Sequence, residues 1–246
     1  MKRLLHKLLS KKEKIEPVCS AVVAAAGSSR RMGGGNKLLL PLEGIPVLAR
    51  TLRALDEAEL VAEIVVAARE EDLLPIADLC KTYGIVKPVK IVRGGETRGA
   101  SVLAAALECR EDAAFIAVHD GARPLAEPEL IDRVIRLAMR TNAAAPAVPV
   151  KDTIKVAADG KVVSTPDRET LRCVQTPQVF DGALLRAALQ AALAADAPIT
   201  DDCSAVERMG KEVYLTEGSY ENIKITTAED MALAAAILQR REEALG

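Results

Sequence analysis

Short apolar runs alternate along the chain with longer stretches in which apolar residues recur every three or four positions. The short runs are residues 18–26, 63–68, 89–94, 113–120 and 143–150. The stretches with helical spacing lie between them, at residues 46–55, 72–84, 97–110 and 127–140. This alternation is typical of βαβ units, in which helices join parallel strands. We therefore predict an α/β fold, Rossmann-like, with a mostly parallel sheet and helices on both of its faces.

The clearest helix is expected in residues 127–140. Its apolar positions form one continuous stripe, made by Leu130, Ile131, Val134, Ile135, Ala138 and Met139. Pro128 suits the first turn, where its missing N–H group costs no helical hydrogen bond. We expect the apolar stripe to pack on the sheet.

The pattern changes after residue 150. Residues 151–171 are expected to form two strands around a turn at Asp159-Gly160, whereas residues 175–180 are too short and too interrupted by proline for a helix. We predict an arm at about residues 151–176 that projects from a single domain spanning residues 17–246. An extended, partly apolar hairpin exposes strand edges that usually need covering, so the arm is expected to form a homodimer.

Helical spacing returns in the last third of the chain. Helices are expected at residues 182–193 and 202–210, and a capping box of Thr226 and Glu229 is expected to open the last helix. Before that helix, residues 222–226 alternate in polarity around Lys224. Lys224 is there either a solvent-facing strand residue or a lysine directed at a phosphate.

Charge and composition exclude several classes of protein. The chain has 33 Lys and Arg against 35 Asp and Glu, a formal charge of −2, and few aromatic residues, which argues against nucleic-acid binding. Its five cysteines are widely spaced and odd in number, so neither a zinc site nor a disulfide framework is indicated and a reducing cytoplasm fits best. Residues 1–16 form a basic extension without the apolar core of a secretory signal, and no membrane segment is expected.

A glycine-rich stretch, GSSRRMGGGNK at residues 27–37, directly follows the first expected strand. The loop after this strand is the usual phosphate cradle of an α/β sheet, because glycines let backbone N–H groups approach oxygens closely. The stretch matches neither the dinucleotide fingerprint nor the P-loop. Its cations Arg30, Arg31 and Lys37 suit a triphosphate and the charge that develops during phosphoryl transfer, although a flexible solvated loop is the simpler alternative.

A second candidate constellation is VHDGARP, where Asp120 and Arg123 follow the run at residues 113–118. A carboxylate at the end of a strand can bind Mg²⁺, which takes oxygen ligands and commonly bridges nucleotide phosphates. A capping or ion-paired aspartate is the alternative, and His119 is expected to be structural. Asp201 and Asp202 could also chelate a metal, but we favour helix capping for them.

Seven ordered blocks together resemble one enzyme family. They are AAAGSSRRM with Lys37 downstream, GGETRGASV, VHDGARP, VKDTIK, QTPQVF, ITDDCSAVE and ENIKIT. This set is similar to the 2-C-methyl-D-erythritol 4-phosphate cytidylyltransferases of the non-mevalonate isoprenoid pathway, from about Val18 to the last helix. The resemblance implies a nucleotidyltransferase fold and transfer of CMP from CTP to methylerythritol phosphate, with Mg²⁺ present and pyrophosphate released.

The resemblance also implies roles for residues. CTP would be bound by Ala25, Ala26, Gly27, Arg31, Lys37, Gly94, Gly95, Ser101, Asp120 and Gly121. The acceptor would be bound by Arg123, Thr153, Arg168, Thr200 and Lys224, with Arg168 reaching from the arm into the site of a second subunit. Arg31, Lys37 and Lys224 would be catalytic, and Asp120 would serve the metal ion.

The sequence departs mildly from the family pattern and leaves two alternatives. Gly121 stands where alanine is common, Lys151 where arginine is frequent, and the residues after Arg168 differ from the usual Asn-Gly-Leu. A ribitol 5-phosphate cytidylyltransferase would use the same CTP loop and Asp120, with a different acceptor pocket. An inactive nucleotide-binding scaffold is the alternative from another class, although it would be expected to have lost at least one of the charged site residues.

Overall fold

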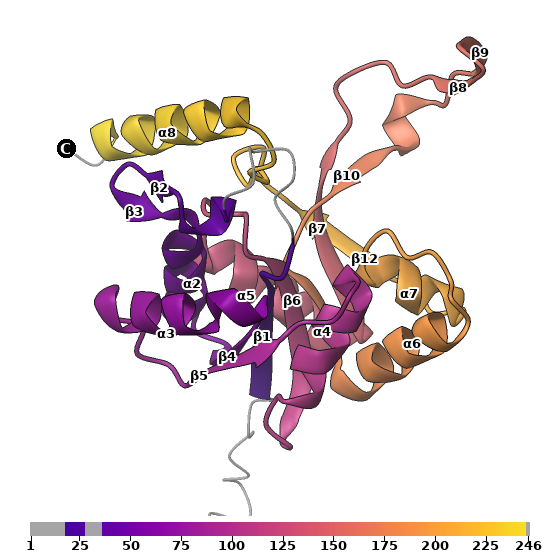
Figure 1. Ribbon diagram of the computed structural model, residues 1–246. Coiled ribbons are helices and arrows are strands. Elements are labelled where there is room, and N and C mark those ends of the chain that lie inside the picture. The colour runs from indigo at the N-terminus through magenta and orange to yellow at the C-terminus, as the bar shows by residue number, and fades with distance from the viewer. Residues whose placement is uncertain (1–17, 28–35, 245–246) are drawn as a thin grey trace, which may run out of the picture.

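The computed structural model describes residues 18–27 and 36–244, and its centre is an eight-stranded sheet (Figure 1). The strands are β1 (Val18–Ala24), β4 (Val61–Ala68), β5 (Val89–Arg93), β6 (Ala113–Asp120), β7 (Ala143–Pro149), β10 (Arg172–Val174), β11 (Gln178–Asp181) and β12 (Tyr214–Glu217). Their order is β10-β7-β11-β6-β1-β4-β5, with β12 also paired to β7. β6, β1, β4 and β5 are parallel to one another, whereas β10 and β11 run antiparallel to their neighbours. The mostly parallel sheet is confirmed.

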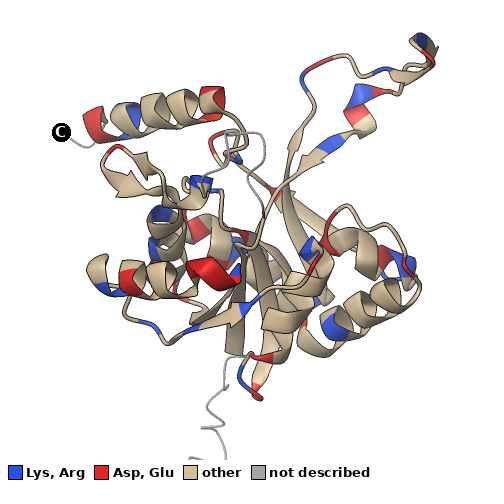
Figure 2. Ribbon diagram, viewed as in Figure 1, with Lys and Arg blue, Asp and Glu red and all other residues tan. Residues whose placement is uncertain are grey.

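Helices cover both faces of this sheet, as predicted. One face packs against α2 (Val47–Glu57), α3 (Leu73–Thr82) and α5 (Pro128–Thr141), and the other against α4 (Arg98–Leu107), α6 (Gly182–Ala194) and α7 (Asp202–Arg208). Successive strand residues point to opposite faces, so Ala21 and Val23 of β1 belong to the first apolar cluster and Val22 to the second. The central strands therefore consist of apolar residues in both sets of positions and are mostly uncharged (Figure 2).

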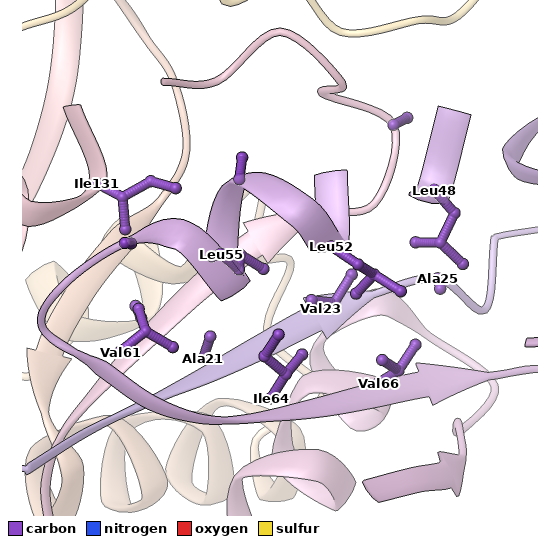
Figure 3. Packing of buried hydrophobic residues seen from close by; sticks show 14 of the residues in the cluster. Ala21, Val23, Ala25, Leu48, Leu52, Leu55, Val61, Ile64, Val66 and Ile131 are labelled. Carbon is purple, nitrogen blue, oxygen red and sulfur yellow. The ribbon is translucent and has the colours of Figure 1, made fainter. Parts of the chain in front are cut away.

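α2 illustrates how the core forms. Leu48, Leu52 and Leu55 recur at helical spacing, are fully buried, and lie over β1 and β4 (Figure 3). Burial of each such leucine contributes roughly 1.5–3 kcal/mol. The core thus fixes the strands whose carboxyl ends carry the candidate site.

α5 confirms the strongest helix prediction. Pro128 occupies its first turn, and Leu130, Ile131 and Val134 are buried on the side that faces the sheet. The helix ends at Asn142, whose positive φ of 67° places it in the left-handed region that closes many helices.

The arm leaves the sheet after β7 and returns along β10 (Figure 1). At its tip, β8 (Val156–Ala158) and β9 (Lys161–Ser164) pair around Asp159 and Gly160, both with positive φ, so the predicted turn is confirmed. Such a turn favours glycine because a side chain is strained there. The hairpin is exposed, with Val162 and Val163 more than half accessible.

One local prediction was wrong, and one alternative that the sequence left open is decided. The last helix, α8 (Ala228–Glu243), is capped by Thr227 and Asp230, one residue later than expected, because the Asp230 carboxylate accepts hydrogen bonds from the backbone N–H groups of both Thr226 and Thr227. Residues 222–226 form a loop instead of a strand, since their hydrogen bonds go to other loops and side chains.

Several short elements complete the chain that the structure describes. A small hairpin of β2 (Pro41–Leu42) and β3 (Ile45–Pro46) follows the 3₁₀ turn η2 (Lys37–Leu39), and two further turns are η3 (Glu70–Asp72) and η4 (Arg168–Thr170). No helix within residues 18–27 and 36–244 combines the length and apolar character needed to cross a membrane. The basic extension at residues 1–16 lies outside the described residues.

Candidate active site

A cavity of about 570 Å³ opens at the carboxyl ends of β1, β5 and β6. Ligands of open α/β sheets bind at this edge. It is lined by Ala24, Ala26, Gly27, Lys37, Leu38, Gly95, Glu96, Thr97, Arg98, Ser101, Asp120, Ala122, Lys224 and Thr226. Residues far apart in the sequence therefore meet here because parallel strands end side by side.

Most of the residues predicted for the nucleotide lie at this cavity. Of these, the lining positions are Ala26, Gly27, Lys37, Gly95, Ser101 and Asp120. Ala25 continues β1 through a backbone hydrogen bond to Ala67, and the Gly121 N–H group donates to Ala24. Arg31 lies outside the described residues, as does most of the glycine-rich stretch.

Gly94 and Gly95 bring the backbone after β5 close to the start of α4. A Cβ atom on Gly94 would lie 2.6 Å from Ala26 Cβ and 2.8 Å from Ser101 Oγ, and one on Gly95 would lie 2.6 Å from Ala100 Cβ. Any side chain at these positions would push the loops apart. Gly94 thus lets the loops that follow β1 and β5 approach each other at the cavity, and Gly95 lets the loop after β5 lie against the first turn of α4.

Three cations converge on Asp120 at the cavity floor. Its carboxylate lies 3.0 Å from Lys224 Nζ, 3.3 Å from Arg123 Nε and 3.6 Å from Arg98 Nη2. Burial alone would raise the pKa of Asp120, but the charges of Lys224, Arg98 and Arg123 outweigh burial and hold this pKa well below its usual value of 3.8. Asp120 is therefore ionised at neutral pH. The alternative of an ion-paired aspartate is therefore what the structure shows.

The backbone of Asp120 is held from behind by a buried threonine. Thr176 Oγ1 accepts a hydrogen bond from the Asp120 N–H group at 3.0 Å and lies 2.9 Å from His119 Nδ1. Because burial lowers the pKa of His119 to about 4, its imidazole is neutral at neutral pH and shares one hydrogen bond with the Thr176 hydroxyl through Nδ1. His119 is thus a structural residue that supports the strand end.

The loop that carries Lys224 is fastened by buried amides. Asn222 Nδ2 donates to the carbonyl of Thr176 at 2.9 Å, and Gln175 Nε2 donates to the carbonyl of Ser219 at 2.7 Å. Arg123 Nη1 donates to the Asn222 carbonyl at 2.6 Å. These bonds connect the loop to the end of β10 and to the segment after β6, which places Lys224 beside Asp120.

Lys37 also contacts the loop that carries Lys224. Asn36 caps η2 by accepting from the Leu38 N–H group, and the Lys37 ammonium donates to the Ile225 carbonyl at 2.7 Å. Lys37 and Lys224 therefore line one cavity although 187 positions separate them in the numbering.

Of the five predicted acceptor residues, Lys224 alone is among the residues that line the cavity, and Arg123 lies beside it through its ion pair with Asp120. Thr153 and Arg168 are exposed on the arm, where Arg168 Nη1 donates to the Lys151 carbonyl at 3.4 Å. Thr200 is exposed before α7, and Asp201 caps that helix by accepting from the Ser204 N–H group, in agreement with the capping prediction.

Sequence reasoning missed Arg98 and Thr226 as parts of this region, and for Asp202 it favoured helix capping over a role in binding. Arg98 lies inside the GGETRGASV block, yet nothing in its spacing indicates that it reaches Asp202 at 2.7 Å. Thr226 lines the cavity beyond Lys224. These residues could be predicted only from the order of the strands in the sheet, which decides which strand ends lie side by side.

Oxygen ligands for a metal ion are few in this site. Within the described ranges no group of three or more His, Cys, Asp or Glu side chains is placed to hold a metal ion. Mg²⁺ commonly takes one or two carboxylates and completes its shell with substrate phosphates and water. The ionised Asp120 at the cavity floor fits such a shared site.

The parallel sheet, the glycine-lined cavity at its carboxyl edge and the cations around Asp120 define a nucleotidyltransferase. Comparisons with known proteins agree with this class. Residues 19–240 match the family model described as 2-C-methyl-D-erythritol 4-phosphate cytidylyltransferase. The chain therefore belongs to the 2-C-methyl-D-erythritol 4-phosphate cytidylyltransferase family.

Individual relatives carry the same name. The chain is 46% identical over 225 residues to the 2-C-methyl-D-erythritol 4-phosphate cytidylyltransferase of Caldanaerobacter subterraneus, covering 91% of this chain and 99% of the relative. It is 44% identical over 208 residues to that of Bacillus cytotoxicus, covering 84% and 92%. Among solved structures, 4-diphosphocytidyl-2C-methyl-D-erythritol synthase from Anaerococcus prevotii superposes with a TM-score of 0.82 at 32% identity, covering 90% and 96%.

Proposed function

We propose that the protein transfers CMP from CTP to 2-C-methyl-D-erythritol 4-phosphate, giving 4-diphosphocytidyl-2-C-methyl-D-erythritol and pyrophosphate. The observation that carries this proposal is the convergence of Lys224, Arg123 and Arg98 on Asp120 in the cavity at the strand ends. Positive charge around one carboxylate suits a polyphosphate and the charge that develops during its transfer. The names of the relatives supply the acceptor.

CTP would lie along the loops that follow β1 and β5. Backbone groups of Ala25, Ala26 and Gly27 would face the nucleotide, and Lys37 with Arg31 would bind its triphosphate. The cytosine and ribose would lie against Gly94, Gly95, Ser101 and Gly121, of which Gly95 and Ser101 line the cavity.

Asp120 would share a Mg²⁺ ion with the nucleotide phosphates. The ion would supply Lewis-acid neutralisation of the phosphate charge. This assignment is supported by the ionised state of Asp120 and by its place at the cavity floor.

Chemistry would proceed by direct displacement. A phosphate oxygen of the acceptor attacks the α-phosphorus of CTP, a new P–O bond forms, and the bond from the α-phosphorus to the bridging oxygen breaks, so that pyrophosphate leaves with the electron pair. The protein's part is to align the reacting atoms and to stabilise charge with Lys37, Arg31 and Lys224. Direct transfer needs no protein nucleophile, and burial raises the pKa of the Cys19 and Cys203 thiols, which keeps both protonated.

The acceptor would bind between Lys224, Arg123 and Thr200, with Thr153 and Arg168 contributed by an arm. Arg168 lies outside the cavity of its own chain, and the exposed apolar hairpin beside it supports a homodimer in which each arm reaches the other subunit's site. A cytoplasmic location is proposed because none of the five cysteines is in a disulfide.

Pyrophosphate release from CTP, Mg²⁺ and methylerythritol phosphate tests the proposal. Asp120→Asn should lower the rate by roughly a hundredfold or more, as loss of a charged group in a phosphoryl-transfer site does. Asp78→Asn is the matched control, because Asp78 is 79% exposed on α3 and does not line the cavity. Parental activity in Asp120→Asn would contradict the assignment of this residue.

A further inference from the structure

Asp202 is a buried carboxylate just outside the cavity. It is the first residue of α7 and has no accessible surface. Its Oδ2 accepts from Arg98 Nη2 at 2.7 Å, whereas its Oδ1 has no hydrogen-bond partner among the residues that the structure describes. Pairing of buried charges rarely repays their desolvation, and apolar residues would pack at least as well. Stability alone therefore does not account for the pair.

Arg98 faces two carboxylates with the same nitrogen. Nη2 is 2.7 Å from Asp202 Oδ2 but 3.6 Å from Asp120 Oδ1, a separation beyond hydrogen-bond range. The two closer cations, Lys224 and Arg123, both face Asp120 Oδ2. Arg98 is thus the cation whose nearest approach to Asp120 is to Oδ1.

The position of Asp202 is fixed by the sheet. Gln178 Oε1 accepts from the backbone N–H groups of Asp202 and Cys203 at 3.0 and 3.1 Å, and Gln178 Nε2 donates to Asp201 Oδ2 at 2.8 Å. Gln178 belongs to β11 and pairs with Val118 of β6, the strand that ends at Asp120. The two carboxylates that compete for Arg98 are therefore held by neighbouring strands.

We propose that Asp202 is a positioning residue that holds Arg98 away from Asp120 and so leaves Asp120 Oδ1 available to the nucleotide and its metal ion. Without the negative charge of Asp202, the nearest carboxylate to the Arg98 guanidinium is Asp120. A direct charge-assisted pair would then form and occupy the oxygen that the ligands need. This inference rests on the ligand-binding role proposed for Asp120.

Asp202→Asn tests the inference because the amide keeps the shape of the side chain and removes its charge. We expect the dissociation constant of CTP, measured by calorimetry with Mg²⁺ present, to rise roughly tenfold, with a similar loss in kcat/KM and little change in melting temperature. Adding Arg98→Met removes the guanidinium that would block Asp120. The double variant should therefore bind CTP more tightly than Asp202→Asn alone, which a purely structural role of Asp202 does not produce.

Glu207→Gln is the matched control. It neutralises an exposed carboxylate on the same helix, α7, that does not line the cavity, so CTP binding should stay within about twofold of the parent. If Asp202→Asn unfolds at the assay temperature, Asp202→Ser replaces it in the comparison with the parent, because serine also removes the charge.

Two results would overturn the inference: parental CTP affinity in Asp202→Asn, or a double variant that binds no better than that single variant. A different measurement shows whether the proposed function itself fails. If Asp120→Asn binds CTP like the parent, the role of Asp120 itself is wrong, whatever Asp202 does.

Discussion

Asp120 and its neighbours show what single residues contribute and how far the sequence reveals it. Asp120 and Arg123 could be placed at a strand end because an apolar run precedes them. Their contacts with Lys224 and Arg98 could not be derived from spacing, since these residues come from a distant loop and from another βα unit. The resemblance to a family pointed to Lys224, whereas Arg98 became visible in the structure alone.

Lys37→Ala tests the proposed phosphate cation at the residue scale. Loss of a cation that stabilises the transition state should reduce kcat/KM by roughly 10²–10³-fold in the pyrophosphate-release assay. Circular dichroism and melting temperature should change little, because Lys37 lines the open cavity, where water can hydrogen-bond to the Ile225 carbonyl in place of its ammonium. Lys211→Ala, an exposed lysine outside the cavity, should retain the parental rate. Near-normal turnover in Lys37→Ala would remove this residue from the mechanism.

His119 predicts a pH dependence of stability. Burial lowers its pKa from 6.5 to about 4, so between these pH values the unfolded chain binds a proton that the folded protein does not. The free energy of unfolding should therefore fall as the pH drops through this window, by up to about 3 kcal/mol, with no such loss above pH 7. Asp120 contributes separately, because its lowered pKa affects stability only at more acidic pH.

Urea unfolding of the parent and of His119→Asn at several pH values measures this contribution. The variant should be less stable at pH 7 but lose less stability than the parent between pH 6.5 and 4.5, the span over which the unfolded-state His takes up its proton. Equal slopes in the two proteins would show that His119 is not the group responsible.

The spacing of apolar residues predicted whole helices and strands well, but it predicted their first and last residues poorly. α5 is long and has one buried apolar stripe, and β6 is long and apolar on both faces, so the sequence pattern identifies both elements clearly. The start of α8 was placed one residue too early because Thr226 and Thr227 are both good caps, and the choice between them depends on where Asp230 turns its carboxylate. The loop around Lys224 was ambiguous because alternation over five residues also fits an extended loop.

Asn222→Ala tests whether that loop positions Lys224. The variant loses the buried hydrogen bond to the Thr176 carbonyl, so the unfolding free energy should fall by about 1–3 kcal/mol. The rate should also fall at temperatures where the variant remains folded, with a raised KM for the acceptor. Gln190→Ala, an exposed position on α6, should leave both quantities unchanged. If the variant loses stability but keeps the parental rate and KM, the loop does not position Lys224 for the reaction.

At the scale of the whole molecule, the proposed dimer predicts that two inactive variants restore activity to each other when they form a mixed dimer. Arg168→Ala and Lys37→Ala should each be nearly inactive alone. In a mixed dimer, the Arg168→Ala subunit keeps its own Lys37 and receives an intact arm from its partner, so one site of two is complete. After subunit exchange in an equal mixture, about a quarter of the parental activity should return. No recovery, in a mixture shown to exchange subunits, would place Arg168 outside the neighbouring site.

The choice of acceptor is the decisive test of the proposed reaction. Pyrophosphate release from CTP with Mg²⁺ should be measured with 2-C-methyl-D-erythritol 4-phosphate and with ribitol 5-phosphate side by side, and the two kcat/KM values compared. We expect efficient release with the first acceptor and a kcat/KM lower by orders of magnitude with the second, because a pocket built for one set of hydroxyl groups leaves polar groups unpaired with the other. Preference for ribitol 5-phosphate, or release with neither acceptor, would contradict the proposed function.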